Sequence, residues 1–82
     1  MLKNSKQKIR VLKIFCQKCK AHLYKYHKQG AGKLIKCYKD MIIRDFTNND
    51  LKCQECGQQF ARHAIIHNRP SNKIISGKVF VR

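Results

Sequence analysis

The chain has 82 residues, of which 19 are Lys or Arg and 4 are Asp or Glu, so its formal net charge is +15. A chain of this length is one small domain, and so small a core usually needs a metal ion, disulfides or a partner for stability. No apolar run approaches the roughly 20 residues of a membrane span, and none has the length a signal peptide needs. The composition therefore argues against a membrane protein.

Residues 1–8 are polar and basic without periodicity, which predicts a disordered arm in front of a single domain over residues 9–82. Residues 9–16 alternate between apolar and polar side chains and are rich in β-branched types. The alternation slips once, at Val11 and Leu12. This pattern predicts a strand with a bulge.

Residues 21–27 also alternate, and their aromatic content favours extended structure over a short helix. A strand here places Tyr24 and Tyr26 on one face. The two glycines in residues 29–32 predict a turn. We expect residues 33–38 to return from this turn and to pair with residues 21–27 as a hairpin.

The next apolar segment, residues 41–46, is expected to be extended. Residues 47–50 read Thr-Asn-Asn-Asp and predict a turn, because Asn and Asp side chains bond their own backbone and tolerate left-handed angles. Residues 60–66 are again predicted to be extended.

Residues 68–72 are predicted to form a loop, since Pro70 is unsuited to a central strand. Residues 73–75 and 79–81 are predicted to form a closing hairpin across Ser76-Gly77. The chain as a whole is therefore predicted to be a small all-β domain of about six short strands with little or no helix.

Two C-x-x-C pairs stand a few dozen residues apart, the spacing of a four-thiolate zinc site in which each tight turn supplies two sulfur ligands. Gly57 follows the second pair and allows its turn to bend back, whereas Lys20 occupies the equivalent position after the first. Redox pairs of the thioredoxin kind are the weaker interpretation, because that motif opens a helix. The predicted ligands of one structural Zn²⁺ are Cys16, Cys19, Cys53 and Cys56.

Over residues 11–60 the chain resembles a zinc ribbon, with two C-x-x-C knuckles, extended segments between and after them, and no helical pattern. The resemblance implies a metal-stabilised fold of short antiparallel strands and hairpins. Ribbons of this kind occur in ribosomal proteins, in transcription machinery and as accessory modules of enzymes. The resemblance therefore implies a metal without fixing a task.

The fifth cysteine, Cys37, lies in a strand pattern and is interpreted as a small buried hydrophobe. Its exchange with Cys16 or Cys19 as a ligand remains an alternative. His22 follows Cys19 by three positions and is a reserve ligand, although a solvated or phosphate-facing role is favoured.

His63 and His67 stand four residues apart, which suits a zinc finger with the second cysteine pair. Only 6 residues separate Cys56 from His63, however, about half of the roughly twelve that such a finger requires. The acidic residues are scattered without a pattern for acid–base catalysis, and we expect no enzymatic activity. They are Asp40, Asp45, Asp50 and Glu55.

The positive charge is concentrated in residues 1–39, which contain twelve basic residues and no acid, whereas residues 40–82 contain seven basic and four acidic residues. Such a field opposes folding by self-repulsion and predicts a polyanionic partner. Tyrosines interleaved with lysines predict stacking on bases. The predicted nucleic-acid contacts are Lys18, Lys20, Tyr24, Lys25, Tyr26, Lys28, Lys33, Lys36 and Lys39.

RNA is favoured over DNA because Lys greatly exceeds Arg and no recognition helix is predicted. The zinc-ribbon resemblance adds that a small and very basic ribbon is similar to ribosomal proteins and ribosome-bound factors. An odd number of cysteines, four of them in ligand spacing, indicates a reducing compartment, and we expect a cytoplasmic protein. The alternative is an adaptor ribbon that docks on a transcription complex or another large assembly. We expect neither a membrane nor a small-molecule substrate as partner.

Overall fold

The computed structural model describes residues 9–30 and 32–82, which form seven β-strands and one 3-10 helix. The predicted arm over residues 1–8 lies outside the described residues. The prediction of a small all-β fold is confirmed, with one strand more than expected. The elements are β1 (Ile9–Cys16), β2 (His22–Gln29), β3 (Lys36–Tyr38), η1 (Lys39–Met41), β4 (Ile42–Asp45), β5 (Ala61–Ile66), β6 (Arg69–Ile74) and β7 (Val79–Val81).

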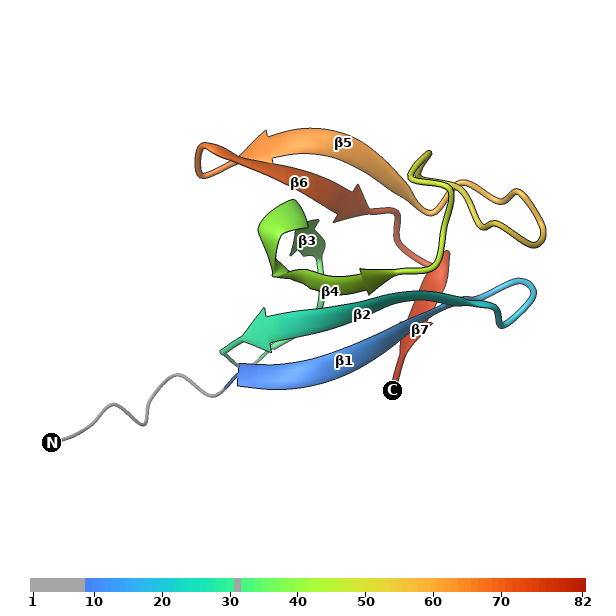
Figure 1. Cartoon of the computed structure of the whole chain (residues 1–82), viewed down its shortest axis with the longest axis horizontal. Coiled ribbons are helices and arrows are strands. Elements are labelled where there is room, and N and C mark those ends of the chain that lie inside the picture. The colour runs from blue at the N-terminus through green and yellow to red at the C-terminus, as the bar shows by residue number, and fades with distance from the viewer. Residues whose placement is uncertain (1–8, 31) are drawn as a thin grey trace, which may run out of the picture.

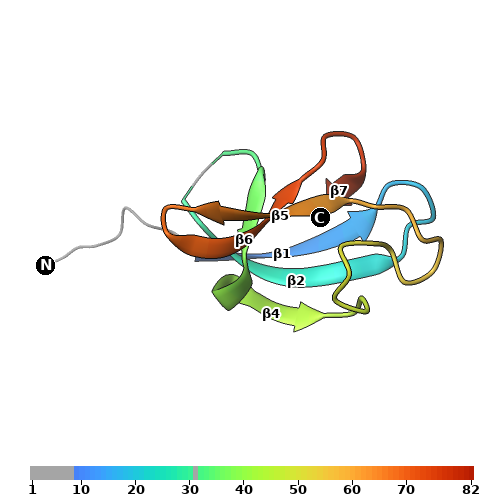
Figure 2. The same cartoon turned by 90° about the horizontal axis from the view of Figure 1, so that it is seen from above.

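The strands form two antiparallel sheets, one with the order β4-β2-β1-β7 and the other with the order β3-β6-β5. Figure 1 shows the sheet of β5 and β6 above that of β1 and β2, and Figure 2 shows the same overlap from above. The chain passes between the sheets after β2, β3, β4 and β6. Both sheets are therefore built from segments that are distant in sequence.

Two predicted hairpins are wrong. Residues 33–38 do not pair with residues 21–27, because β3 pairs with β6 and the two edges of β2 are taken by β1 and β4. Residues 79–81 form β7, which pairs with β1 in the first sheet, whereas residues 73–74 end β6 in the second. Alternation identified these strands, but it carries no information on which edge a strand joins.

The bulge in the β1–β2 hairpin also lies elsewhere than the apolar pattern indicated. Val11 is 49% exposed and simply faces outward, so β1 is regular at that point. The register shifts further along, between Ile14, opposite Tyr24, and Phe15, opposite His22. Leu23 is the extra residue, and it and Tyr24 are both buried.

Pro70 lies in β6, the central strand of the second sheet, where residues 68–72 were predicted to be a loop. The turn before β6 has φ of +51° and +60° at its two residues, as a two-residue hairpin turn requires. In such a hairpin the second pair from the turn, here Ile65 and Pro70, makes no ladder hydrogen bond. On the other edge, β3 ends opposite Ser71. The missing N–H of Pro70 therefore interrupts neither ladder.

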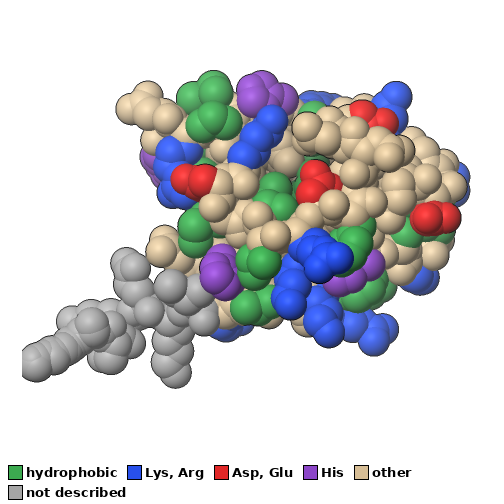
Figure 3. All heavy atoms as spheres, viewed as in Figure 1, with side chains coloured by type: hydrophobic (Ala, Val, Ile, Leu, Met, Phe, Trp, Pro, Cys, Tyr) green, Lys and Arg blue, Asp and Glu red, His purple; other side chains and the backbone are tan. Residues whose placement is uncertain are grey.

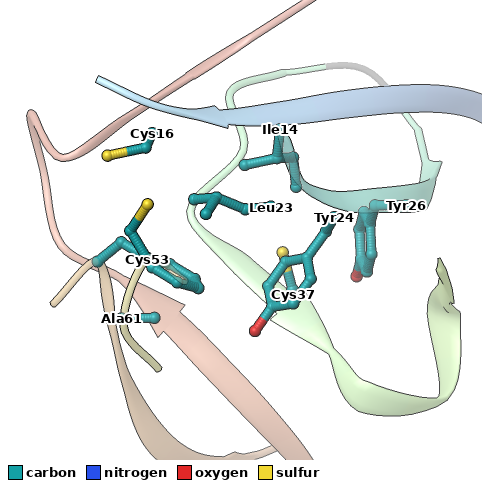
Figure 4. Close-up of a cluster of buried hydrophobic side chains, with 9 residues drawn as sticks. Ile14, Cys16, Leu23, Tyr24, Tyr26, Cys37, Cys53 and Ala61 are labelled. Atoms are coloured by element: carbon teal, nitrogen blue, oxygen red, sulfur yellow. The ribbon is translucent and has the colours of Figure 1, made fainter. Parts of the chain in front are cut away.

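The core lies between the sheets and is centred on Tyr24, whose ring meets that of Phe60 edge-on at 5.5 Å between centroids. Asn72 of β6 donates its side-chain N–H to the Tyr24 hydroxyl at 2.9 Å and so ties the sheets together. Figure 4 shows most of the cluster. The buried apolar residues are Ile14, Cys16, Leu23, Tyr24, Tyr26, Cys37, Cys53, Phe60 and Ala61.

The turn predicted over residues 47–50 is confirmed, and it leads the chain from β4 to the second cysteine pair. Asp45 Oδ1 accepts hydrogen bonds from the backbone N–H of Thr47 at 2.7 Å and from its hydroxyl at 2.6 Å. Asp50 Oδ1 accepts from the N–H of Lys52 at 3.1 Å. These side chains satisfy backbone donors that a strand would otherwise pair.

Candidate metal centre

The two C-x-x-C pairs fold into the same turn. In each, the N–H four residues after the first cysteine donates to the carbonyl of that cysteine at 2.9 Å, Lys20 to Cys16 and Gly57 to Cys53. In each, the N–H of the first cysteine donates to the carbonyl five residues later at 2.8 Å. The first turn, which has Lys20 where the second has Gly57, therefore has the same hydrogen bonds as the second.

Each turn connects two paired extended segments. The first joins β1 to β2, so it is the loop of the longest hairpin in the fold. The second lies between short extended segments, where Lys52 bridges Gln59 and the N–H of Phe60 donates to the carbonyl of Leu51 at 3.0 Å. Backbone hydrogen bonds therefore define the shape of both turns without a metal ion.

The position after each pair is left-handed, with φ of +69° at Lys20 and +79° at Gly57. A side chain in this region costs about 1–2 kcal/mol, which glycine avoids. Lys20 offsets part of this cost because its ammonium donates to the carbonyl of Gln17 at 2.7 Å and lies 5.1 Å from the Phe80 ring centroid.

We expect Lys20→Gly to raise the free energy of unfolding of the metal-loaded protein by about 0.5–1 kcal/mol, since backbone relief exceeds the added freedom of the unfolded chain. The reciprocal change, Gly57→Lys, is expected to lower it by about 1 kcal/mol, because no atom crowds a Cβ there and only the backbone angle is strained. Urea unfolding of the two variants measures both changes. A loss of stability in Lys20→Gly would mean that the lysine contacts outweigh the backbone.

The four sulfur atoms converge on one point between the turns. All four lie within 4.8 Å of one another, with 3.7 Å between Cys16 and Cys56 and 3.4 Å between Cys19 and Cys53. A tetrahedron with metal–sulfur bonds of about 2.3 Å has sulfur–sulfur edges of about 3.8 Å. The cysteines are free thiols, and their spacing fits a single metal ion bound by four thiolates.

Hydrogen bonds to sulfur surround this cluster. The backbone N–H of Glu55 donates to the Cys53 sulfur at 3.4 Å, and the side-chain N–H of Gln58 donates to the Cys16 sulfur at 3.8 Å. Donors of this kind stabilise thiolate charge around a bound metal. Gln58 belongs to no motif in the sequence, although its place directly after the Gly57 turn is the signal that could have identified it.

The thiols of Cys16 and Cys19 differ in pKa when no metal is bound. Burial raises the pKa of the Cys16 thiol, but hydrogen bonds from the Cys19 and Lys18 backbone and from neighbouring thiols lower it to about 7. The Ala21 backbone lowers the pKa of Cys19, but desolvation and the other three thiols raise it to about 12. Cys19 therefore retains its proton at neutral pH, and a metal must displace that proton on binding.

The reserve ligands lie outside the cluster. Cys37 is fully buried in β3 and is absent from the group of four, so its interpretation as a small buried hydrophobe is confirmed. His22 is held in place by Phe15, whose ring stacks on it at 4.7 Å, and by a hydrogen bond from its Nε2 to the Tyr24 carbonyl at 3.1 Å. His67 lies in the β5–β6 turn, where Nδ1 meets the Tyr38 hydroxyl at 2.9 Å.

Burial raises the pKa of the Cys37 thiol to about 12. We therefore expect Cys37 to resist alkylation by iodoacetamide at pH 8 in the metal-loaded protein and to react after chelation, because the thiolate is the reactive form. Mass spectrometry of the digested protein identifies the labelled residue. Labelling of Cys37 at the rate of an unfolded peptide before chelation would contradict its burial.

The lysines predicted to contact nucleic acid do not share one face. Lys18 and Lys20 lie in the first cysteine turn, and Lys25 and Lys28 on β2. Lys36 lies in the second sheet, opposite Lys73 of β6. The remaining two flank β3, Lys33 in the preceding connection and Lys39 in η1.

The prediction that Tyr24 and Tyr26 stack on bases is wrong. The two residues do share a face of β2, as predicted, but it is the face toward the core, where they are 0% and 3% exposed. The Tyr26 hydroxyl accepts a hydrogen bond from the backbone N–H of Tyr38 at 2.8 Å. Their rings complete the core because the small interior has few large aliphatic side chains to fill it.

A scan against protein-family models finds no match for this chain, and searches of curated proteins and of solved structures likewise find none. Across residues 9–30 and 32–82, no helix is both long and apolar enough to cross a membrane.

Proposed function

We propose that this chain is a zinc-ribbon protein in which one structural Zn²⁺ organises the fold and a basic surface binds nucleic acid. The convergence of four sulfur atoms within 4.8 Å is the observation that carries the proposal. Four thiolates in a tetrahedral arrangement favour Zn²⁺ over harder cations, and a complete set of protein ligands leaves no position for substrate. The metal we propose is therefore structural, and catalysis at the metal is not part of the proposed function.

The charge supports nucleic acid as the partner. Of the basic side chains in the described part of the chain, only Arg69 lies within 4.0 Å of a carboxylate, that of Asp40, at 2.6 Å. The others form no ion pair within this distance, and their mutual repulsion is unfavourable until a polyanion covers them. RNA is the favoured polymer because the described residues form no helix long enough to enter a major groove. A cytoplasmic ribonucleoprotein such as the ribosome is the setting we propose.

Purification at low salt tests this function directly. We expect one zinc per chain by elemental analysis, and copurifying RNA that RNase but not DNase removes. Raising the salt should release the RNA and leave the zinc in place, since phosphate contacts are screened while thiolate bonds are not. Recovery of a protein partner that survives nuclease treatment, without any nucleic acid, would instead indicate an adaptor.

A further inference from the structure

The outer face of the four-stranded sheet carries a continuous row of rings. Phe46 follows β4, His22 begins β2, Phe15 lies on β1 and Phe80 on β7. Successive ring centroids are 4.4, 4.7 and 5.2 Å apart, with interplanar angles of 33°, 18° and 15°. The row crosses all four strands, and the bulge at Leu23 is what brings His22 into line with Phe15.

A row of cations runs beside the rings. Lys13 stands two residues before Phe15 on β1, and the intervening Ile14 is fully buried, so Lys13 and Phe15 share the outer face. Lys25 of β2 pairs with Lys13, and Arg44 of β4 pairs with Lys25. Arg82 exchanges two backbone hydrogen bonds with Lys13, at 3.0 and 2.9 Å. Four positive residues therefore occupy neighbouring positions, three on adjacent strands and Arg82 directly after β7.

Like charges directly opposite each other destabilise a sheet, so this row needs an anion to neutralise it. The nearest acid in sequence, Asp45, does not serve, because its carboxylate accepts hydrogen bonds from Thr47 and its charge raises the pKa of the buried Tyr24. Asp45 is exposed, but alternation along β4 places it on the opposite side of the strand from Arg44. In Figure 3 the Lys and Arg side chains gather along the lower side of the molecule, below β2 and β4, where no acidic side chain is visible.

The ends of the ring row are the places where another flat group can join it. The inner rings, Phe15 and His22, have a neighbour on each side, whereas Phe46 and Phe80 each have one. At the Phe80 end the surface is hollowed by about 490 Å³ between Phe15, Gln17, Lys20, Phe80 and Arg82. Lys20 and Arg82 place their charges 5.1 and 5.6 Å from the Phe80 ring centroid.

We propose that this outer face binds a single-stranded nucleic acid, with its phosphates along Arg44, Lys25, Lys13 and Arg82 and one base stacked on Phe80. The inference rests on the proposed function and assigns it a surface. A flat ring beside two cations suits a base and its phosphate, a combination that single-strand-binding surfaces share. An unpaired strand is required because the bases of a duplex are stacked on one another and cannot reach the hollow.

The test compares two triple variants that remove the same charge from opposite sheets. Lys13→Gln, Lys25→Gln and Arg44→Gln neutralise the outer face of the first sheet. The control neutralises the cross-strand row of the second sheet, where Lys36 and Arg62 both pair with Lys73. Its changes are Lys36→Gln, Arg62→Gln and Lys73→Gln. Affinity for a labelled 12-nucleotide single strand, as RNA and as DNA, is measured from 50 to 200 mM salt.

With about 0.7 counterions released per phosphate contact, the four-cation row accounts for a loss of about 50-fold in affinity over this salt range. The first triple variant is expected to reduce the slope of log affinity against log salt by about 2, and the control to leave it nearly unchanged. Equal reductions would show that binding is diffuse, and a larger reduction in the control would move the site to the second sheet. Either result overturns the assignment while leaving nucleic-acid binding intact.

The ring is tested separately with Phe80→Leu, which keeps an apolar side chain and removes the stacking surface. We expect affinity for the single strand to fall about 5- to 150-fold at constant zinc content, and the weaker affinity for a duplex to be unaffected. Equal affinity of the wild-type protein for single strand and duplex would overturn the stacked base. Absence of binding to every oligonucleotide at 50 mM salt, or binding only to anionic vesicles or acidic peptides, would remove the proposed function itself.

Discussion

Replacing Cys53 by Ser is expected to abolish the cooperatively folded state at 25 °C. Binding of Zn²⁺ to a four-ligand structural site is worth about 10–16 kcal/mol near neutral pH, and in small domains this free energy is free energy of folding. The net stability of a domain is only about 5–15 kcal/mol. Cys53 is 3% exposed and belongs to both the four-sulfur cluster and the core, so we expect its loss to exceed what the rest of the fold supplies.

Zinc content and the amide dispersion of a two-dimensional NMR spectrum measure this loss. The matched control is Cys37→Val, which also removes a buried cysteine but none of the four clustered sulfurs. Valine suits a strand and the apolar environment of that site, so we expect the control to keep both zinc and dispersion. Zinc retained at full stoichiometry in Cys53→Ser, or lost in Cys37→Val, would show that the ligand set is different.

Tyr24→Ala is expected to lower the free energy of unfolding of the zinc-loaded protein by about 3–5 kcal/mol, the usual cost of truncating a buried aromatic residue. The Tyr24 ring is fully buried against Phe60. Its hydroxyl also accepts the hydrogen bond from Asn72, whose side-chain oxygen has no partner of its own. Truncation therefore leaves both polar atoms of that amide unpaired in the core.

Tyr24→Phe separates the two contributions, because it keeps the ring and removes only the hydroxyl. Leaving the Asn72 donor unsatisfied is expected to cost about 1–3 kcal/mol, measured by urea unfolding at saturating zinc. Affinity for RNA should stay at the wild-type value while the variant is folded. A loss of RNA affinity at unchanged stability would mean that the ring is accessible to bases.

Local chemistry was sufficient to predict most of the elements and the four cysteines that cluster. The C-x-x-C turns close through backbone hydrogen bonds a few residues apart, and alternation located the segments that became β1, β2 and β5. Strand partners could not be predicted, because β3 and β7 are three residues long and join edges set by the whole fold. The loop predicted around Pro70 was wrong for the same reason. A proline is accepted in this central strand only because β3 ends opposite Ser71, and no local sequence pattern indicates where β3 ends.

The proposed binding surface could not be predicted either, because it also depends on which strands become neighbours. The sequence placed Lys25 and Tyr24 in one basic, aromatic stretch, but a strand sends neighbouring residues to opposite faces, and Tyr24 is buried. The outer ring row draws Phe15, Phe46 and Phe80 from three distant segments. Alternation within β1 places Phe15 and Lys13 on the same face of the strand, and this was the signal in the sequence that pointed to the outer surface.

The pairing of β7 with β1 has a consequence for biosynthesis. One edge of β1 is occupied by β2 almost as soon as it is made, but the other edge, from Ile14 to Cys16, receives its partner only when residues 79–81 have emerged. Until then a growing chain displays unpaired backbone groups beside an aromatic side chain, the kind of edge on which nascent chains aggregate. A metal already captured by the two cysteine turns would hold the rest of the domain together during that interval.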